Sequence, residues 1–191
     1  MDTKPLVSIV IPSKNQGQFL QNTLDSVLNQ NYRPIEIIII DSASTDNTQE
    51  ILKNYGEKPE IQWISELDNG HADGINKGFR LAKGEIVAWL NSDDIYYSKD
   101  VIQTVVSHFE VNKSHDVVYG HAAIISKNNL LLRFFLVPPY NANRITRRNL
   151  IVQPTVFMRK KIVQAEKLTV GQIGLDYDYW LRLIVKQYSF H

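Results

Sequence analysis

Cysteine is absent from the sequence, and this absence removes several kinds of site at once. A chain without cysteine has no disulfide, no thiolate metal site and no cysteine nucleophile. The absence fits a reducing compartment, in which disulfides are rare. Neither sign of charge dominates, because 21 Lys and Arg face 20 Asp and Glu for a formal net charge of +1. We therefore expect no overall electrostatic attraction to nucleic acid or to an anionic membrane.

Long apolar runs and glycine-rich phosphate motifs are also missing. No run approaches the roughly 18 residues that a membrane-spanning helix needs. The first residues, "MDTKPLVSIVIPSKN", hold a short apolar run without the basic segment of a signal peptide, so we expect none. Neither G-x-G-x-x-G after the first predicted strand nor G-x-x-x-x-G-K-[ST] occurs. These absences disfavour a dinucleotide dehydrogenase and a P-loop enzyme.

What remains is the composition of an ordinary folded protein of 191 residues, 43% of them hydrophobic. This length suits one domain. Apolar runs rich in β-branched residues predict buried strands at residues 6–11, 35–40, 61–64 and 85–90. Apolar residues at helical spacing predict helices between and after these strands, marked by Leu20 and Leu24, Ile75 and Phe79, and Ile102 and Val105. Ser44 and Asp46 are N-cap candidates for a further helix that carries Ile51 and Leu52.

The alternation of these elements predicts the fold class. Strands that are apolar on both faces and alternate with amphipathic helices indicate an α/β fold with a mostly parallel sheet flanked by helices on both faces. We expect Pro12 to end the first strand. Beyond about residue 112 the pattern changes to β character at 116–120, either a hairpin or an extended excursion around "KNN", a short strand at 155–158 and a helix at 175–186. No stretch between these two parts has the composition of a linker. We therefore predict that residues 1–112 and 113–191 are halves of one domain.

Polar side chains follow three of the predicted strands. Because the carboxyl ends of parallel strands meet at one edge of a sheet, we expect these residues to gather there: Pro12, Ser13, Asn15, Asp41, Ser42, Ser92, Asp93 and Asp94. The adjacent Asp93 and Asp94 repel each other, and a hard divalent cation such as Mg²⁺ or Mn²⁺ relieves that repulsion. The alternative is that the two aspartates cap the following turn and face water.

Five segments resemble the family 2 glycosyltransferases of the GT-A fold: "VSIVIPSKNQGQFLQNTLDSVLNQNY", "EIIIIDSASTDNT", "DNGHADGINKGFRLAKGEIVAWLNSDD", "QPTVFMRK" and "DYDYWLRL". The resemblance runs from about residue 6 to residue 186. It implies transfer of a sugar from a nucleotide-diphosphate sugar, with uridine favoured, to the hydroxyl of a glycan or lipid-linked acceptor. It also implies inversion of the anomeric centre, a need for Mn²⁺ or Mg²⁺, and a role in polysaccharide or other cell-surface glycan synthesis.

The resemblance implies a role for several residues of the donor-binding half. The region of Pro12 lies beneath base and ribose, and Asp41 meets the nucleotide base. Ser42 stands where many relatives have a second acidic residue. The choice between a uridine and a guanosine donor therefore stays open. Asp73, in "ADGINKG", contacts base or ribose. As alternatives, Asp41 caps the loop after its strand and Asp73 is an exposed helix residue.

The resemblance also assigns the metal and the catalytic base. Asp93 and Asp94 match the acidic pair, with Asp94 as the direct metal ligand. Asp176, in the acceptor-side half, matches the catalytic base, and Asp178 is its competitor two residues on. The alternative is a structural role, in which Asp176 caps its helix. The arginines of "NRITRRN" either meet a diphosphate or anionic acceptor or lie in a solvated loop, and we expect His71, His121 and Trp180 to have structural roles.

Three other protein classes share parts of this pattern. A two-component receiver needs an acidic pair directly after the first strand, where this chain has "IPSKN". A nucleotidyltransferase needs a glycine-rich N-terminal loop that is missing here. A GT-A domain that binds nucleotide-sugar without efficient turnover remains the alternative, because family members usually continue beyond the helix that holds Asp176. We expect a cytoplasmic protein, associated at most peripherally with the inner face of the membrane.

Overall fold

The computed structural model describes residues 4–191. Its main sheet has six strands in the order β3-β2-β1-β4-β8-β5. These are β1 (Val7–Ser13), β2 (Ile35–Asp41), β3 (Ile61–Ser65), β4 (Ile86–Trp89), β5 (Val117–Val118) and β8 (Phe157–Arg159). The first four strands pair in parallel, whereas β8 runs antiparallel to both of its neighbours. The α/β fold class and the four strands of the first half are confirmed.

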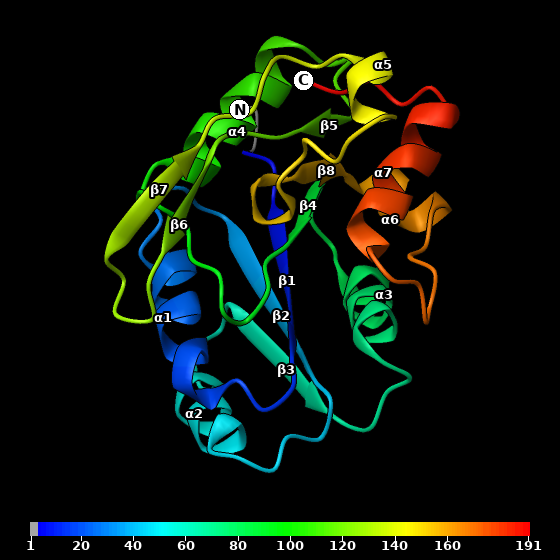
Figure 1. Ribbon diagram of the computed structural model, residues 1–191. Helices are drawn as coiled ribbons and strands as arrows, with labels where there is room; N and C mark the ends of the chain where they lie inside the picture. The colour runs from blue at the N-terminus through cyan, green and yellow to red at the C-terminus, as the bar shows by residue number, and fades with distance from the viewer. Residues whose placement is uncertain (1–3) are drawn as a thin grey trace.

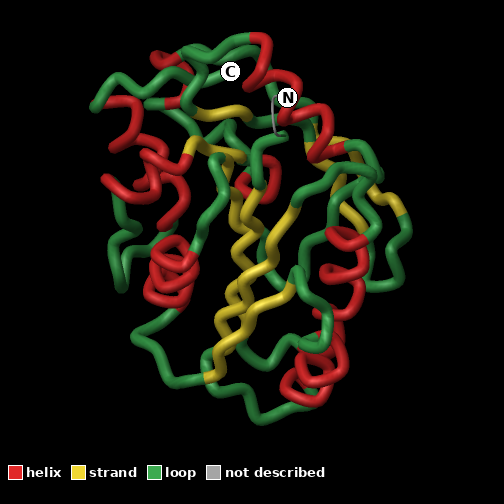
Figure 2. The backbone as a smooth tube through the Cα atoms, turned by 180° about the vertical axis from the view of Figure 1, so that it is seen from behind, coloured by secondary structure: helices red, strands yellow, loops and turns green. Residues whose placement is uncertain are grey.

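Helices cover both faces of the sheet, as Figure 1 and the reverse view in Figure 2 show. On one face lie α1 (Gly17–Leu28), α2 (Thr48–Tyr55) and α4 (Val101–Val111). On the other lie α3 (His71–Leu81), α6 (Lys160–Ala165) and α7 (Leu175–Val185). Side chains of a strand alternate between the two cores, so that Ile9 packs toward the first and Val10 toward the second.

The prediction that Pro12 ends the first strand is wrong, because β1 continues to Ser13. β1 pairs with β2 along its whole length but with β4 only as far as Val10. The backbone groups of Pro12 and Val10 point to the β4 side, since alternate residues of a parallel strand direct their N–H and C=O groups the same way. β4 has already ended at Trp89, so the missing N–H of proline costs no bond in the sheet.

The second half of the chain adds a hairpin and short helices. β6 (Ala122–Ile125) and β7 (Leu131–Phe135) pair on either side of "KNN", outside the main sheet, so of the two predicted alternatives the hairpin forms. The strand expected at 155–158 is displaced, because Gln153–Thr155 form a 3-10 helix, η1, and β8 begins at Phe157. α5 (Ala142–Ile145) and α6 were not predicted, since helices of four and six residues contain too few apolar repeats to detect.

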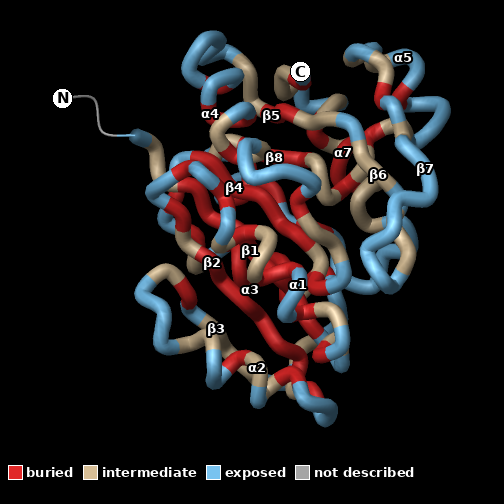
Figure 3. The backbone as a smooth tube through the Cα atoms, turned by 90° about the vertical axis from the view of Figure 1, so that its left-hand side faces the viewer, coloured by how far each residue is buried: buried red, intermediate tan, exposed pale blue. Residues whose placement is uncertain are grey.

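The last predicted helix corresponds to α7, and Trp180 on this helix is buried against Trp89 of β4 with ring centroids 5.5 Å apart. Figure 3 shows the strands buried through the middle of the molecule and β7 exposed at its edge. Across residues 4–191, no helix combines the length and the apolar character that a membrane crossing requires. The division of the domain near residue 112 stays a prediction.

Candidate active site

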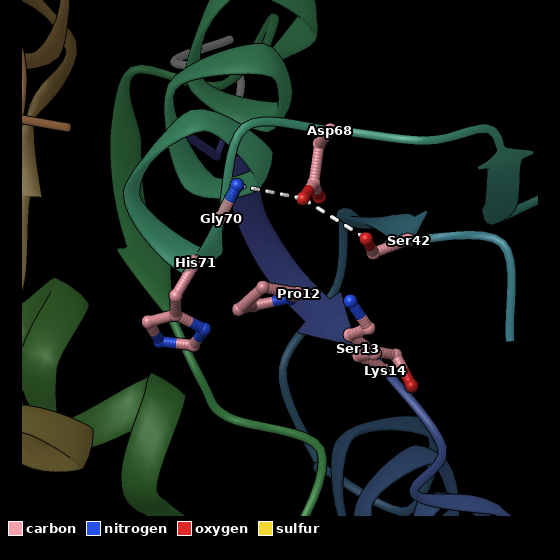
Figure 4. A pocket seen from close by; sticks show the side chains of 7 residues that line it. All are labelled: Pro12, Ser13, Lys14, Ser42, Asp68, Gly70 and His71. Atoms are coloured by element: carbon pink, nitrogen blue, oxygen red, sulfur yellow. Dashed lines mark hydrogen bonds between the residues drawn. The ribbon is translucent and has the colours of Figure 1, made fainter. Parts of the chain in front are cut away.

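A small pocket lies at the carboxyl ends of β1 and β2, the edge at which parallel α/β proteins bind ligands. Its volume is about 100 Å³. The lining comes from the end of β1, the residue after β2 and the loop between β3 and α3 (Figure 4): Pro12, Ser13, Lys14, Ser42, Asp68, Gly70 and His71. Three of the predicted site residues, Pro12, Ser13 and Ser42, are thus brought together.

Asp68 forms one wall of this pocket. Its Oδ1 accepts a hydrogen bond from Ser42 Oγ at 2.9 Å and another from the backbone N–H of Gly70 at 2.9 Å (Figure 4). Gly70 has a φ of 106°, a conformation that glycine adopts without strain, and α3 begins directly after it. Within the described residues, Asp68 Oδ2 accepts no hydrogen bond. A carboxylate oxygen is therefore free to receive a donor from a ligand.

Asp41 lies beneath the pocket rather than on its surface. The residue is fully buried, and its carboxylate accepts hydrogen bonds from Ser65 Oγ at 2.6 Å, from the backbone N–H of Ser44 at 3.1 Å and from the Ser44 hydroxyl. These bonds tie the end of β2 to β3 and to the loop that follows β2. They also fix the neighbouring Ser42, which is the residue that reaches the pocket.

The loop after β1 is held against the loop after β2. Asn15 adopts a left-handed φ of 52°, its backbone N–H donates to Ser44 Oγ at 2.7 Å, and its Oδ1 accepts from the Thr45 N–H at 2.8 Å. Nearby, the Ser13 hydroxyl is buried and finds no hydrogen-bond partner in residues 4–191. A buried hydroxyl of this kind is available to a bound ligand.

Two predicted site residues, Asp73 and Ser92, lie outside the pocket lining. Asp73 Oδ2 accepts hydrogen bonds from the backbone N–H of Asn69 at 3.1 Å and from Asn69 Nδ2 at 3.2 Å, and the first of these bonds holds the pKa of Asp73 below its usual value. Ser92 is buried, and its carbonyl accepts from Thr23 Oγ1 at 2.9 Å. The observed contacts of both residues therefore fix loops beside the site.

The loop after β4 presents the acidic pair. Asp93 is exposed and Asp94 is half-buried. Burial, and after it the negative charge of Asp93, raises the pKa of Asp94 to about 6. Asn91 Nδ2 donates to Asp94 Oδ2 at 3.1 Å and to Gln153 Oε1 at 2.9 Å, and Gln153 Nε2 donates to the Trp89 carbonyl at 2.8 Å. Asp94 is thereby oriented from β4 and from η1 together.

These residues fit a hard divalent cation. Asp93, Asp94 and the Asn91 amide oxygen are the oxygen ligands that Mg²⁺ and Mn²⁺ prefer. Asn91 Oδ1 is buried without a hydrogen-bond partner among the described residues, which leaves it free to bind a cation. Residues 4–191 contain no cluster of three or more His, Cys, Asp or Glu arranged for a metal. A phosphate-bound Mg²⁺ needs only one or two protein carboxylates, however.

The first turn of α7 carries the two candidate bases. Asp178 Oδ2 accepts hydrogen bonds from Arg182 Nε at 3.0 Å and from Thr169 Oγ1 at 3.4 Å. The described residues give Asp176 a single weak partner, Asn149 Nδ2, which donates to Asp176 Oδ2 at 3.3 Å. Asp176 shares a helix face with Trp180, four residues on, which stacks against the end of β4. Asp176 lies in the first turn of α7.

Two further residues enter the site without a role having been predicted for them. His71 was expected to be structural, but its side chain lines the pocket. Burial lowers the pKa of His71, whereas the Asn91 side chain and the negative charge of Asp93 act in the opposite direction. Gln153 orients Asn91 across 62 residues of sequence. His121 does have a structural contact, since its Nδ1 accepts from the Val137 N–H at 3.1 Å.

A larger cavity of about 860 Å³ opens beside the acidic pair. It extends from Asp93 and Asp94 between α4 and the β6–β7 hairpin, and Phe134 and Phe157 are among the apolar side chains that line it. The Tyr96 hydroxyl in its wall is buried without a partner in the described part of the chain, and burial raises the pKa of Tyr96. The cavity therefore offers an apolar space next to the acidic pair.

Comparison with known sequences decides the family. The profile described as Glycosyl transferase family 2 matches residues 8–162. This chain belongs to glycosyltransferase family 2. The family 2 domain is 30% identical over 199 residues to "Uncharacterized glycosyltransferase MJ1057" of Methanocaldococcus jannaschii, covering 98% of this chain and 67% of that protein. It is also 30% identical over 186 residues to the hyaluronan synthase of Pasteurella multocida, covering 94% of this chain but only 19% of that protein.

Solved structures confirm the GT-A fold of the family 2 domain. The mannosyltransferase PcManGT from Pyrobaculum calidifontis, in complex with GDP-Man and Mn²⁺, superposes with a TM-score of 0.76 at 16% identity, over 99% of this chain and 55% of that one. S. aureus TarS 1-349 in complex with UDP-GlcNAc superposes with a TM-score of 0.73 at 18% identity, over 91% of this chain and 53% of that one. The domain thus spans about half the length of these structures.

Proposed function

We propose that this domain binds the donor and performs the chemistry of an inverting, metal-dependent glycosyltransferase. It moves a sugar from a nucleotide-diphosphate sugar, with UDP-sugars favoured, to an acceptor hydroxyl. The observation that carries the proposal is that the pocket walled by Asp68 and the acidic pair Asp93 and Asp94 both lie beside the carboxyl ends of strands. Asp176 is included because "DYDYWLRL" resembles the acceptor-side motif of the family and because its carboxylate has one weak hydrogen-bond partner among the described residues.

The pocket suits a nucleotide base that offers an imino N–H. Uracil and guanine both have this donor and adenine lacks it, and a carboxylate oxygen accepts such a bond well. Asp68 Oδ2 is the free acceptor in the pocket wall, while Asp41 holds Ser42 in place from beneath. Support comes from the bound donors of the two structural relatives, GDP-Man and UDP-GlcNAc, whose bases both carry an imino N–H.

The acidic pair suits the donor diphosphate. Asp94, Asp93 and the Asn91 amide oxygen would hold Mn²⁺ or Mg²⁺, and the bound cation supplies positive charge that offsets the charge of the diphosphate. Asp94 must lose its proton to act as a ligand, and its raised pKa ties this role to pH. The structure of PcManGT with Mn²⁺ supports a divalent cation in this fold.

The proposed chemical step uses Asp176 as general base. Asp176 takes the proton of the acceptor hydroxyl while the acceptor oxygen forms a bond to the anomeric carbon. The bond between that carbon and the diphosphate oxygen breaks, and the diphosphate leaves with the electron pair. Attack opposite the leaving group inverts the anomeric centre, as in inverting glycoside hydrolysis. Asp176 comes from α7 and Asp94 follows β4, so the two carboxylates approach the site from different elements.

The biological setting follows from the relatives and from the composition. The hyaluronan synthase and the chondroitin synthase of Pasteurella multocida are both 30% identical to this chain. We assign the reaction to cell-surface glycan synthesis on a glycan or lipid-linked acceptor. The complete lack of cysteine supports a reducing, cytoplasmic location for the domain.

A panel of nucleotide-sugars with and without Mn²⁺ tests the proposal. A ligand at 100 times its Kd adds about 2.7 kcal/mol to stability, so thermal unfolding reveals the correct donor. We expect stabilisation by uridine or guanosine donors with Mn²⁺, and release of nucleoside diphosphate. Stabilisation without release, even with acceptors present, would instead identify a donor-binding domain without turnover. No Mn²⁺-dependent response to any donor contradicts the proposal.

A further inference from the structure

The β6–β7 hairpin carries a concentrated apolar surface, here named the hairpin patch. It consists of six large hydrophobic side chains that are at least 46% exposed: Ile124, Leu130, Leu131, Leu132, Phe134 and Leu136. Leu131 and Leu132 are consecutive strand residues and point to opposite faces, so neither face of β7 is covered. Figure 3 shows β7 exposed along the edge of the molecule. Contiguous apolar exposure of this kind marks an interaction surface.

The segment that contains the hairpin carries charges of one sign. Between residues 117 and 165 the sequence contains no Asp or Glu and eight Lys or Arg. Lys127 and Arg133 belong to the hairpin, and Arg144 belongs to α5. Within the described residues these three side chains form no ion pair. The segment is therefore locally cationic, although the net charge of the whole chain is only +1.

The apolar hairpin and the cationic helix α5 lie along the same edge of the molecule in one view. In Figure 3, β7 and α5 both lie along the right-hand edge of the molecule. Leucine and phenylalanine combined with lysine and arginine are the composition of segments that lie at a membrane surface, where the apolar groups enter the acyl boundary and the cations meet lipid phosphates. The geometry therefore suits a planar, anionic partner.

We propose that the hairpin patch docks onto the surface of an anionic lipid bilayer. The leucines of β7 enter the interface, while Lys127, Arg133 and Arg144 face the lipid headgroups. A second copy of this chain fits less well, because pairing two β7 strands would bring like charges from two Arg133 side chains together. The proposal goes beyond the glycosyltransferase reaction, since it uses none of the residues assigned to donor binding or catalysis.

Vesicle co-sedimentation of the full chain tests the proposal. The vesicles contain phosphatidylcholine alone or mixed with phosphatidylserine. We expect binding only to the mixed vesicles, about fivefold weaker for Arg133→Gln and about tenfold or more weaker for Leu130→Ser/Leu132→Ser. Matched controls are Val111→Ser, which removes an 89% exposed apolar side chain from the end of α4, and Lys53→Gln on α2. Both controls should bind as the wild type does.

Several results would overturn the proposal. Equal binding to both vesicle types, binding to neither, or unchanged binding of the hairpin variants each contradicts it. A dimer that forms without lipid and is lost in Leu130→Ser/Leu132→Ser would identify a second copy of the chain as the partner instead. Calorimetry of nucleoside diphosphate binding on the same variants should give wild-type affinity. Failure of the membrane proposal and failure of the proposed reaction are thereby measured separately.

Discussion

Arg182 pairs with Asp178 one turn earlier on α7, with Nε donating to Oδ2 at 3.0 Å. Asp178, the alternative candidate for the catalytic base, is therefore already engaged by Arg182. We predict that Asp176→Asn lowers nucleoside diphosphate release by about 100-fold or more, the usual effect of losing a general base. Donor affinity should stay unchanged, because Asp176 is assigned to the acceptor. Steady-state release assays and calorimetry of donor binding measure the two quantities.

The control is Asp178→Asn, which removes the ion pair on the same helix. We expect near-normal turnover and a loss of about 0.5 kcal/mol or less in the free energy of unfolding, because the pair is partly exposed and spans one helical turn. Urea denaturation measures this loss. If Asp178→Asn abolishes turnover while Asp176→Asn retains it, the two roles must be exchanged.

A second prediction concerns Asp94, whose pKa is raised to about 6 by burial and then by the charge of Asp93. The folded protein holds this proton more tightly than the unfolded chain. The resulting contribution to stability is fully present below pH 3.8, the ordinary pKa, and is lost as the pH rises through about 6. Asp94→Asn should therefore stabilise the metal-free protein near neutral pH by up to about 3 kcal/mol. Calorimetric unfolding with and without Mn²⁺ should also show that the variant no longer responds to the cation.

The same pKa predicts how metal binding depends on pH. A proton and a cation compete for Asp94, so the Mn²⁺ affinity of the wild type should fall about tenfold per pH unit below a pH of about 6. Asp93→Asn removes the neighbouring charge and should shift this dependence to lower pH. Glu110→Gln, on the exposed side of α4, should change neither property. An unchanged Mn²⁺ response in Asp94→Asn is the result that excludes the metal assignment.

A third prediction separates the roles of Asp68 and Asp41. Asp68→Asn keeps an oxygen acceptor but places an N–H₂ donor toward the imino N–H of the base. Binding of uridine and guanosine diphosphates should weaken about 10- to 100-fold, the value of a hydrogen bond to a charged group. Adenosine diphosphate binding and the melting temperature should change little. A uniform loss for all three nucleotides would show that Asp68 only shapes the loop.

Asp41→Ala should behave differently, because the carboxylate is buried and accepts from Ser44 and Ser65. Removal leaves buried donors unpaired, so we expect a loss of about 2 kcal/mol or more in unfolding free energy together with weaker binding of every nucleotide. Thermal denaturation and calorimetry measure both effects. Wild-type stability and wild-type nucleotide binding in Asp41→Ala would contradict its place beneath the pocket.

The strands were predictable because burial on both faces forces continuous apolar runs, such as "IEIIII" in β2. Ser13, Ser42 and Asp94 at the carboxyl ends of the strands were also predictable. Polar residues that come after a buried apolar run emerge at the end of the strand. Asp68 was not predictable in this way. Its position depends on a hydrogen bond from Ser42, 26 residues earlier, and "ELDNG" alone has the composition of an ordinary polar turn.

The sequence pattern also could not predict which carboxylates are buried. Asp41 is the last residue of β2 and Asp93 follows β4, yet the first is fully buried and the second is exposed. The difference arises because Ser65 of β3 reaches Asp41 across the sheet, a contact set by strand order rather than by local sequence. Gln153 likewise meets Asn91 only because β8 inserts beside β4.

The last prediction tests the close packing of α3 on β1. A Cβ atom added at Gly78 would lie 2.2 Å from Val10 Cγ1, and Val10 is fully buried in the sheet. Gly78→Ala gains helix propensity of about 1 kcal/mol, but the clash with a close-packed strand costs about 1–3 kcal/mol and more where neighbours cannot move. We therefore expect a net loss of unfolding free energy in urea denaturation. Gly120→Ala is the matched control, because its added Cβ meets nothing within 4 Å. It should change stability by about 0.5 kcal/mol or less, and a Gly78→Ala protein as stable as this control would show that α3 can move away from β1.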